Sequence, residues 1–478
     1  MTTHIATGNR TAPQTLTLIV ISISQFVIAL DYSIVYVALP SMGADLAMTE
    51  ASLQWVVSSY AILFAGLLLL GGRVVDKLGG RRAYIFSVTV FGVASLLGGI
   101  AQDSVMLLLA RALQGTAAAA LLPAVLSLLS RSFPTGPERS SAYAIWGAVG
   151  ASGLASGVVL GGILTTFSWR WTFFINLPLI LVCVIGAFKA FENDRRVESL
   201  RVPALSSLMG TAAVLLVGLF LTLLADPDTA PAVLFVCLLM ALAAVATFLI
   251  NEHRSANPLI ERPLRRLACL RAGSGAAALY MASVGTEFFL VTLFLQEHRG
   301  YLPLAAGLAF LPLAVMVTVG NVAAGRLIEA RGVRVTLSLG FGIAAAGLVL
   351  LAFCLGIESF WIGLLPGFLI SGLGHGVIYT ALFVLGTSDA PQASQGTAGA
   401  LITTAQYVSG SISLALLVLI IAAMGSTLGY QVAFAINGAF AILGVLLAQT
   451  YGRKRQPMTQ GQPVERPDPC SQSRERIG

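Results

Sequence analysis

The sequence predicts an all-α polytopic membrane protein with fourteen transmembrane spans, arranged as two six-helix pseudo-repeat bundles plus two inserted helices, with both termini cytoplasmic. Three observations support this prediction. Hydrophobic residues make up 57% of the 478-residue chain and charged residues only 10%, whereas a soluble domain has about 25% charged residues. Apolar segments of roughly 20 residues, each long enough to cross a bilayer, recur along the chain. A charged motif also occurs twice, each time between two such segments.

The positions of the cations test the number of spans, because positively charged loops stay on the cytoplasmic side of a membrane. With fourteen spans, 25 of the 28 lysines and arginines fall on one side. Arg170 and Arg299 fall outside, and Arg111 lies within a span. A miscounted helix would have inverted every later loop, so we expect an even number of spans. Spans seven and eight are joined by an acidic outside turn at Asp226 and Asp228.

An internal repeat divides the chain. The segment from Gly325 to Gly332 repeats the segment from Gly72 to Gly79, and Glu287 follows Asp31 at nearly the same offset. Parallel repeats of this kind build a transporter site near the middle of the bilayer. We therefore expect a cytoplasmic tail at 1–15, a first six-helix bundle at 16–190, a two-helix insert with cytoplasmic loops at 191–271, a second six-helix bundle at 272–450, and a disordered cytoplasmic tail at 451–478.

Several function classes are excluded. The net charge of +7 is not accompanied by a compact basic domain, so we expect no nucleic-acid partner. The five cysteines and four histidines are scattered without metal-ligand or catalytic spacing, and no phosphate-binding loop for ATP is present in the sequence. We therefore expect no enzyme activity, no catalytic residues, no metal and no cofactor.

Three charges are predicted to lie inside the membrane, where an ionisable residue costs about 2.5 to 3.5 kcal/mol and needs a partner or a function. Asp31 lies about 22 Å from the cytoplasmic start of its span, and Arg111 about 20 Å from the same face. Glu287 falls at the same level in the second half. We expect Asp31 and Glu287 to face a central cavity and to couple transport to protons, with Arg111 as the fixed countercharge. The alternative is a static ion pair that joins helices.

A short charged hairpin between spans two and three is the candidate cytoplasmic gate. We expect Asp76 to bind the free amides that begin span thirteen near Gln395, because a helix N-terminus carries partial positive charge. Arg73 and Arg82 would order Asp76 there. A plain solvated loop is the alternative. The predicted gating residues are Gly72, Arg73, Asp76, Gly79, Arg81 and Arg82.

Span five carries a stripe of small residues. Its predicted helix-packing motif consists of Gly153, Gly157, Gly161 and Gly162. Such spacing lets another helix approach closely, and we expect that helix to come from the opposite half, so that the halves can rock. Tight static packing is the alternative.

Candidate residues lining the cavity are Tyr32, Tyr36, Gln114, Phe288, His375 and Gln406. Tyr32, Tyr36 and Phe288 would equally fit a position facing lipid. A histidine with its ordinary pKa changes charge near neutral pH, but His375 would equally fit a contact between helices.

Four motifs together resemble one family. They are the Leu30–Pro40 segment of span one, the charged hairpin, the Arg111–Gly115 segment of span four, and the Trp169–Pro178 segment that opens span six. On these motifs the chain resembles the fourteen-span drug/proton antiporters of the major facilitator superfamily. In one departure, Gly153-Leu154 and Gly157-Val158 lack the prolines usual in the antiporter motif.

The resemblance implies a proton-coupled secondary exporter of drugs, antibiotics or amphipathic metabolites that works by alternating access. The alternative is a carrier on the same fold for a nutrient, an amino acid or another small metabolite, because fold does not determine cargo. We expect protons, a small-molecule substrate and the lipid bilayer as partners, and a monomer. Only three of the 28 cations are lysines, which favours a bacterial source and hence the bacterial plasma membrane.

Overall fold

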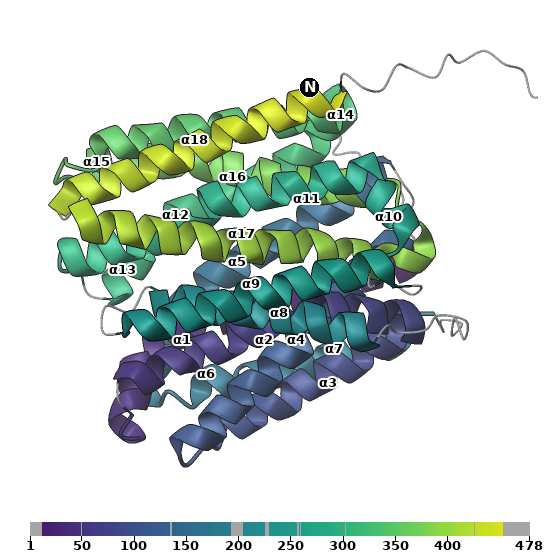
Figure 1. Ribbon diagram of the computed structural model, residues 1–478, viewed down its shortest axis with the longest axis horizontal. Coiled ribbons are helices and arrows are strands. Elements are labelled where there is room, and N and C mark those ends of the chain that lie inside the picture. Colours follow the sequence, from purple (N-terminus) through teal and green to yellow (C-terminus); the bar gives the residue numbers. More distant parts are fainter. Residues whose placement is uncertain are drawn as a thin grey trace, which may run out of the picture.

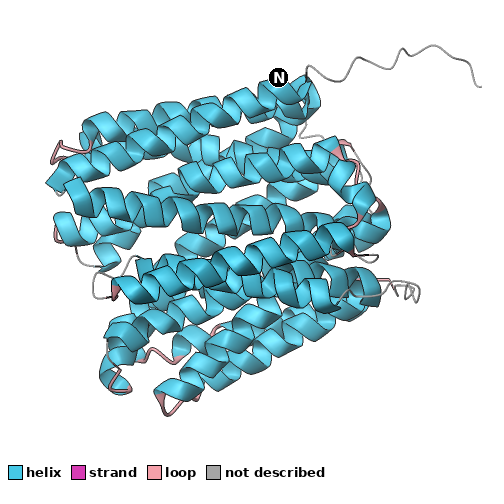
Figure 2. Ribbon diagram, viewed as in Figure 1, coloured by secondary structure: helices cyan, strands magenta, loops and turns pink. Residues whose placement is uncertain are grey.

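The computed structural model describes residues 12–48, 50–133, 136–192, 204–224, 229–255, 258, 260–301, 303–424 and 426–452. Across these ranges the regular structure is helical and contains no strand (Figure 2). The last 26 residues of the predicted C-terminal tail lie outside the described residues, as do Asp226 and Asp228 of the acidic turn and most of the N-terminal tail. The all-α class is confirmed for the described part of the chain.

The helices follow the predicted spans closely. The first group consists of α1 (Ala12–Asp45), α2 (Glu50–Leu78), α3 (Gly80–Gly99), α4 (Ser104–Ser132), α5 (Pro137–Phe167), α6 (Trp171–Phe174) and α7 (Asn176–Ala190). The middle group consists of α8 (Ala204–Leu224), α9 (Pro231–Arg254) and the short α10 (Arg262–Arg266).

The last group begins with α11 (Ala268–Tyr280), the π-helical turn η1 (Met281–Gly285), α12 (Thr286–Leu293), the π-helical turn η2 (Phe294–His298), α13 (Pro303–Ala309) and α14 (Leu311–Cys354). It continues with α15 (Phe360–Gly363), α16 (Leu365–Thr387), the 3₁₀ turn η3 (Gln392–Ser394), α17 (Gln395–Met424) and α18 (Ser426–Gly452).

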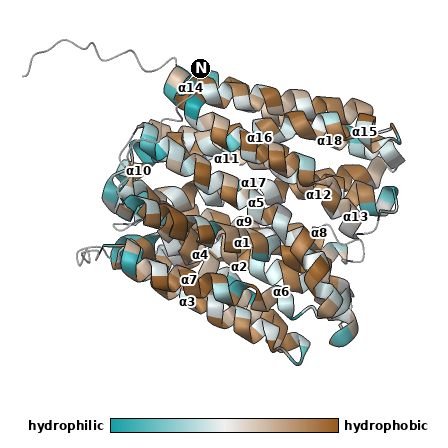
Figure 3. Cartoon of the chain, turned by 180° about the vertical axis from the view of Figure 1, so that it is seen from behind, coloured by the Kyte–Doolittle hydropathy of each residue, from teal (hydrophilic) through white to brown (hydrophobic). Residues whose placement is uncertain are grey.

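Local sequence explains where several helices begin. The Asp103 side chain accepts a hydrogen bond from the backbone N–H of Met106 at 2.8 Å and so caps α4. A proline occupies the first turn of both α5 and α9, where its missing N–H costs nothing. Along the helix shafts, apolar side chains dominate, while hydrophilic residues gather at the ends (Figure 3).

Many of these helices suit a membrane. Within the described ranges, 11 helices are long and apolar enough to cross a bilayer, or up to 12 when the two parts of α5, bent by 41°, count as one span. One candidate, Ala305–Cys354, is 50 residues long, and α8 contributes only a shorter apolar stretch. The chain is therefore an all-helical, multi-span membrane protein.

The charged repeat is also a repeat of backbone conformation. Gly79, between α2 and α3, has a φ of 89°, and Gly332, inside α14, has a φ of 78°. Both glycines occupy the last position of the repeated motif. Residues with a side chain rarely adopt this left-handed conformation, so each glycine marks a sharp turn of the chain. At Gly332 this turn divides α14 into two helices.

The two ends of the sequence form separate groups that meet along two seams. In Figure 1, α1 to α4, α6 and α7 lie in the lower part in purple and blue, α5 lies at mid-height, and α11 to α18 lie mostly above in teal, green and yellow. Along one seam α2 packs against α17, and along the other α5 packs against α14. The helices α8 and α9 pack against each other, and α8 also contacts α2 and α17.

The glycine stripe of α5 packs against α1, which belongs to the same half. A Cβ added at Gly153 would lie 2.8 Å from the Phe26 carbonyl oxygen, and one at Gly161 would lie 2.9 Å from the Ile34 carbonyl oxygen. A Cβ at Gly157 would likewise meet Ser33. The expectation that the approaching helix comes from the opposite half is therefore wrong. The spacing gives a close helix contact but does not identify the helix that makes it.

Candidate functional site

A buried ion pair joins α1 to α4 in the first half. Arg111 donates a hydrogen bond from Nη1 to Asp31 Oδ2 at 2.7 Å, and the two side chains are 1% and 0% exposed. Gln114 and Asn176 each donate an amide hydrogen bond to Asp31 Oδ1 at 2.8 Å. The carboxylate thus accepts three hydrogen bonds, one of them from a cation.

The guanidinium group of Arg111 has further partners. Its Nε donates to the Val56 carbonyl oxygen at 3.0 Å, and Nη1 also donates to Gln114 Oε1 at 2.9 Å. Its Cζ lies 4.5 Å from the centre of the Tyr60 ring, within range of a cation–π interaction. The cation is therefore held in place by α2 as well as by α1 and α4. Gln114, predicted to line the cavity, belongs to this buried network.

Glu287 of α12 is a buried carboxyl group of the second half. Its side chain is fully buried, and Oε1 accepts a hydrogen bond from the Ser371 hydroxyl at 2.7 Å. Oε2 has no hydrogen-bond partner in the part of the chain that the structure describes. No ion pair to Glu287 occurs among the residues that the structure describes. The two carboxylates predicted to act in parallel therefore have different surroundings, one paired with a cation and one bonded to a hydroxyl.

A row of aromatic rings runs from the first half into the second. Tyr36 and Tyr32 lie with ring centres 5.8 Å apart, and Tyr32 lies 6.4 Å from Tyr60. Phe64 continues the row, 5.9 Å from Tyr60 and 4.9 Å from Tyr407 of α17. We refer to these five rings as the aromatic row. Tyr32 and Tyr36 are candidates from the sequence, whereas Tyr60, Phe64 and Tyr407 carry no sequence motif and were not predicted.

The remaining cavity candidates occupy separate places. Phe288 stacks on Phe310 with ring centres 4.7 Å apart, and Gln406 is 4% exposed. His375 is buried, and its Nε2 is hydrogen-bonded to the hydroxyl of Tyr280. The sequence contained no signal for Tyr280, because a single tyrosine in an apolar helix has no motif of its own.

Asp76 lies against the N-terminus of α17. Its Oδ1 accepts a hydrogen bond from the Gly396 N–H at 3.1 Å, and its Oδ2 accepts from the Thr397 N–H at 3.1 Å and the Thr397 hydroxyl at 2.5 Å. The Asp76 side chain is buried. Because these amides have no partner within the helix, a carboxylate here satisfies them and stabilises the helix dipole.

The arginines of the hairpin have other partners. Arg73 forms an ion pair with Glu261 at 2.6 Å and donates to the Pro258 carbonyl oxygen at 2.9 Å. Both partners lie in the segment between α9 and α10, so Arg73 ties that segment to the hairpin rather than ordering Asp76 by a direct bond. Arg81 lies over the Phe188 ring, and Arg82 is exposed.

Gly72 explains how α2 comes close enough to α17 for this contact. A Cβ added there would lie 2.8 Å from the Ala400 Cβ, 2.9 Å from the Gly396 carbonyl oxygen and 3.1 Å from the Thr397 Cα. Any side chain would therefore separate the two helices. The hairpin and α17 together form a contact between the halves, which we call the latch and define as Gly72, Asp76, Gly396 and Thr397.

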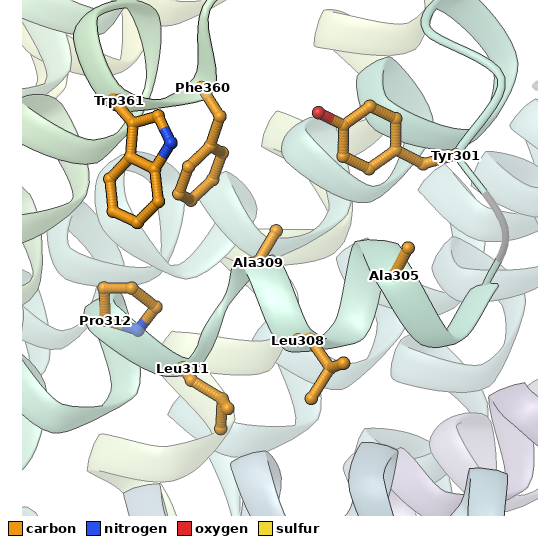
Figure 4. Close-up of a pocket in the computed structure, with 8 residues that line it drawn as sticks. All are labelled: Tyr301, Ala305, Leu308, Ala309, Leu311, Pro312, Phe360 and Trp361. Carbon is orange, nitrogen blue, oxygen red and sulfur yellow. The ribbon is translucent and has the colours of Figure 1, made fainter.

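An apolar hollow of about 410 Å³ lies at the end of the second half far from the latch. Figure 4 shows Phe360 and Trp361 above the corner between α13 and α14. Both side chains help to line the hollow. None of its eight lining residues is charged, so it holds none of the predicted coupling groups. They are Tyr301, Ala305, Leu308, Ala309, Leu311, Pro312, Phe360 and Trp361.

Comparisons with known proteins agree with the fold and the motifs. The family model described as Major Facilitator Superfamily matches residues 21–414. The chain is 34% identical to the puromycin resistance protein of Streptomyces alboniger over 410 residues, which cover 84% of this chain and 80% of that protein. It is also 34% identical to the cephamycin export protein CmcT of Amycolatopsis lactamdurans over 414 residues, which cover 86% and 85% of the two chains.

Solved structures are similar in fold at low sequence identity. The human organic anion transporter matches with a TM-score of 0.67 and 14% identity, covering 91% of this chain and 100% of that one. The proton:xylose symporter XylE matches with a TM-score of 0.67 and 12% identity, covering 92% and 96%. The family model and the relatives that are 34% identical to this chain show that it is a membrane-embedded transporter and not an enzyme. Both the family model and the close relatives show that the chain belongs to the Major Facilitator Superfamily.

Proposed function

We propose that this protein is a proton-coupled exporter that moves antibiotics or other amphipathic metabolites out of a bacterial cell across the plasma membrane by alternating access. The observation that carries the proposal is the ion pair between Asp31 and Arg111, buried where a fixed charge is costly. A role of Asp31 in binding and releasing a proton would explain why charged side chains occupy this buried position.

Protonation of Asp31 would change the contact between α1 and α4. The carboxylate now neutralises Arg111 and accepts hydrogen bonds from three donors. A neutral carboxyl group would leave the guanidinium charge buried without a counterion, which favours a different arrangement of the helices. A proton that moves inward down the membrane potential releases about 2.3 kcal/mol of free energy per 100 mV, and this free energy would drive cargo outward. Glu287 is the corresponding proton site that we propose for the second half.

The cargo class is inferred from the relatives and from the aromatic row. Relatives are named for puromycin resistance, cephamycin export and lincomycin resistance. In this chain, Tyr36 is exposed and Tyr32 and Tyr407 are half-buried, so these three rings of the aromatic row offer stacking surface and hydroxyl groups, whereas Tyr60 and Phe64 are buried behind them. Such a surface suits flat amphipathic molecules, because aromatic rings bind by area and the hydroxyls orient polar edges.

We further propose fourteen spans with both termini cytoplasmic. The 11 candidates become fourteen when bent α5 counts as one span, α8 as another, and the long Ala305–Cys354 candidate as two separated by Gly332. Residues 16–190 and 272–450 would then form the two moving bundles, with 191–271 as the insert, in a protein that acts as a monomer. The latch would hold the cytoplasmic face closed and would have to release before cargo can enter from the cytoplasm.

Efflux measured in everted membrane vesicles tests the coupling. We expect Asp31→Asn to abolish proton-gradient-driven uptake of a drug identified in a susceptibility panel, with protein levels matched by immunoblot. Asp103→Asn is the matched control, because Asp103 is exposed and asparagine also caps helices. If Asp31→Asn transports as well as the parent at every pH, the proposed coupling is wrong.

A further inference from the structure

Two hydrogen bonds between α16 and the α11–α12 helix stack one above the other. Ser371 bonds to Glu287, and His375 bonds to Tyr280. Ser371 and His375 are four residues apart on α16, so they share one face and are separated by about 6 Å along the axis. Tyr280 and Glu287 are two turns apart on the opposing helix. The four side chains therefore form two rungs between the same helices.

Each rung leaves one polar atom without a partner. Glu287 Oε2 and His375 Nδ1 are both buried and make no hydrogen bond to any residue in the described ranges. Their side chains are 0% and 9% exposed. Buried polar atoms are rarely left unpaired, because burial removes their hydrogen bonds to bulk water. Two such atoms on adjacent rungs indicate a small polar site between them.

The direction of the side chains places this site between the rungs. Side chains on a helix lean toward its N-terminus, so His375 leans toward the turn that carries Ser371. One water molecule with two hydrogen bonds of about 2.8 Å spans roughly the rise of one turn. A buried water also needs at least two polar partners, and these two atoms supply them.

We infer that a bound water bridges Glu287 Oε2 and His375 Nδ1, and that Glu287, this water, His375 and Tyr280 form a proton relay toward the cytoplasmic face. The inference rests on the proposed function, since it gives the Glu287 proton a route. A proton leaves the Glu287 carboxyl for the water, which passes one to Nδ1. Nε2 then gives its proton to the Tyr280 oxygen, and the Tyr280 hydroxyl proton leaves for bulk water when the two halves separate on the cytoplasmic side. One proton moves in total, and no bond between heavy atoms changes.

The surroundings of His375 contain no competing charge among the described residues that contact it. The ring centres of Tyr280 on α11 and Tyr379 on α16 lie 5.7 Å apart, and Tyr379 is one turn beyond His375. From α14, Asn321 bonds to Thr380 of α16. The groups that face this part of α16 from the packed helices are Tyr280 of α11, Asn321 of α14, Tyr143 and Trp146 of α5, and Tyr407 of α17.

Proton exchange at Glu287 can be measured without any cargo. Infrared spectroscopy of the purified protein in lipid bilayers follows the band of the protonated carboxyl group, which is assigned by its loss in Glu287→Gln. After transfer to deuterated buffer, we expect His375→Gln and Tyr280→Phe to slow exchange of this band by about tenfold or more, in line with the loss of a positioned proton-transfer group. Both substitutions keep the size of the side chain.

Two controls separate a relay from a structural role. His298→Gln changes an exposed histidine that bonds to Thr427, and exchange should stay at the parent rate. Ser371→Ala removes a hydrogen bond to Glu287 but leaves the relay intact, so exchange should not slow. Parent-like exchange in both His375→Gln and Tyr280→Phe would overturn the relay, as would the absence of a protonated Glu287 band at any pH. Neither result depends on whether Asp31 couples protons to export.

Discussion

Replacing Asp31 with asparagine should destabilise the first half strongly, although the two side chains have the same shape. In the parent, Oδ2 accepts a hydrogen bond from Arg111, and Oδ1 accepts from Gln114 and Asn176. Asparagine has one oxygen and one NH₂ group. Whichever way the amide turns, its NH₂ faces at least one existing donor, and Arg111 loses its counterion.

The structure gives the size of this effect. Both partners are almost fully buried, so removing one charge leaves the other uncompensated, which costs about 3 to 5 kcal/mol. For a unit of 150 to 250 residues each kcal/mol lowers the melting temperature by about 2 to 4 °C, so we expect a decrease of roughly 6 to 20 °C. The double variant Asp31→Asn/Arg111→Gln should recover part of this loss, because it removes the buried unpaired charge.

Thermal unfolding in detergent measures this decrease. A thiol-reactive dye reports unfolding through Cys183, which is free and buried in the first half. Asp103→Asn serves as the control and should melt with the parent. A melting temperature for Asp31→Asn within a degree or two of the parent would refute the reasoning, as would a double variant that loses the sum of the two single losses.

Three further predictions concern the latch and the contact between Asp45 and Arg170. Asp76→Asn should lower transport turnover severalfold with unchanged membrane insertion, because the amide replaces a charge that binds the N-terminus of α17; transport and immunoblot assays check this. Gly72→Ala should lower both the melting temperature and the transport rate. Gly325→Ala, at the equivalent position of the repeat, should be tolerated, because a Cβ at Gly325 would lie 3.7 to 3.8 Å from its nearest neighbours. Equal effects of the two substitutions would contradict this difference in packing. Hydrogen bonds from Arg170, and then from Trp169, hold the pKa of Asp45 below its ordinary value of 3.8. Asp45→Asn should therefore lower the melting temperature by a constant amount from pH 5 to 8, because the carboxylate's contribution is lost only as the pH falls through its lowered pKa.

Depth along the helices was the most informative signal for the site. Asp31 and Arg111 are predicted to lie at one depth, and the structure contains that pair. Asn176 lies roughly 12 Å into its predicted span from the outside, close to the level of Arg111, and could have been found in the same way. It was missed because an asparagine carries no charge and so raised no question of a partner.

Other contacts could not be read from the sequence. Ser371 and Tyr280 each bond to a buried titratable residue, yet serine and tyrosine are common in membrane helices and form no pattern. The glycine spacing in α5 predicted a close helix contact but gave no information on its partner, because the spacing describes only one of the two surfaces. The internal repeat shows that the two halves are similar. It does not show which helix packs against which, because that also depends on side chains outside the repeated motif.

The repeat also shows where the halves differ. Gly72 touches α17 closely and Asp76 bonds to it, but the equivalent Gly325 lies farther from α5, and the equivalent Glu329 is exposed. At the level of the hairpins, contact between the halves is therefore tight along the α2–α17 seam and loose along the α5–α14 seam. The ion pair from Arg73 to Glu261 strengthens the tight side, because it joins the hairpin to the segment that follows the inserted helices. The insert thus lies along the seam where the latch is made, and its exit segment bonds to the same hairpin.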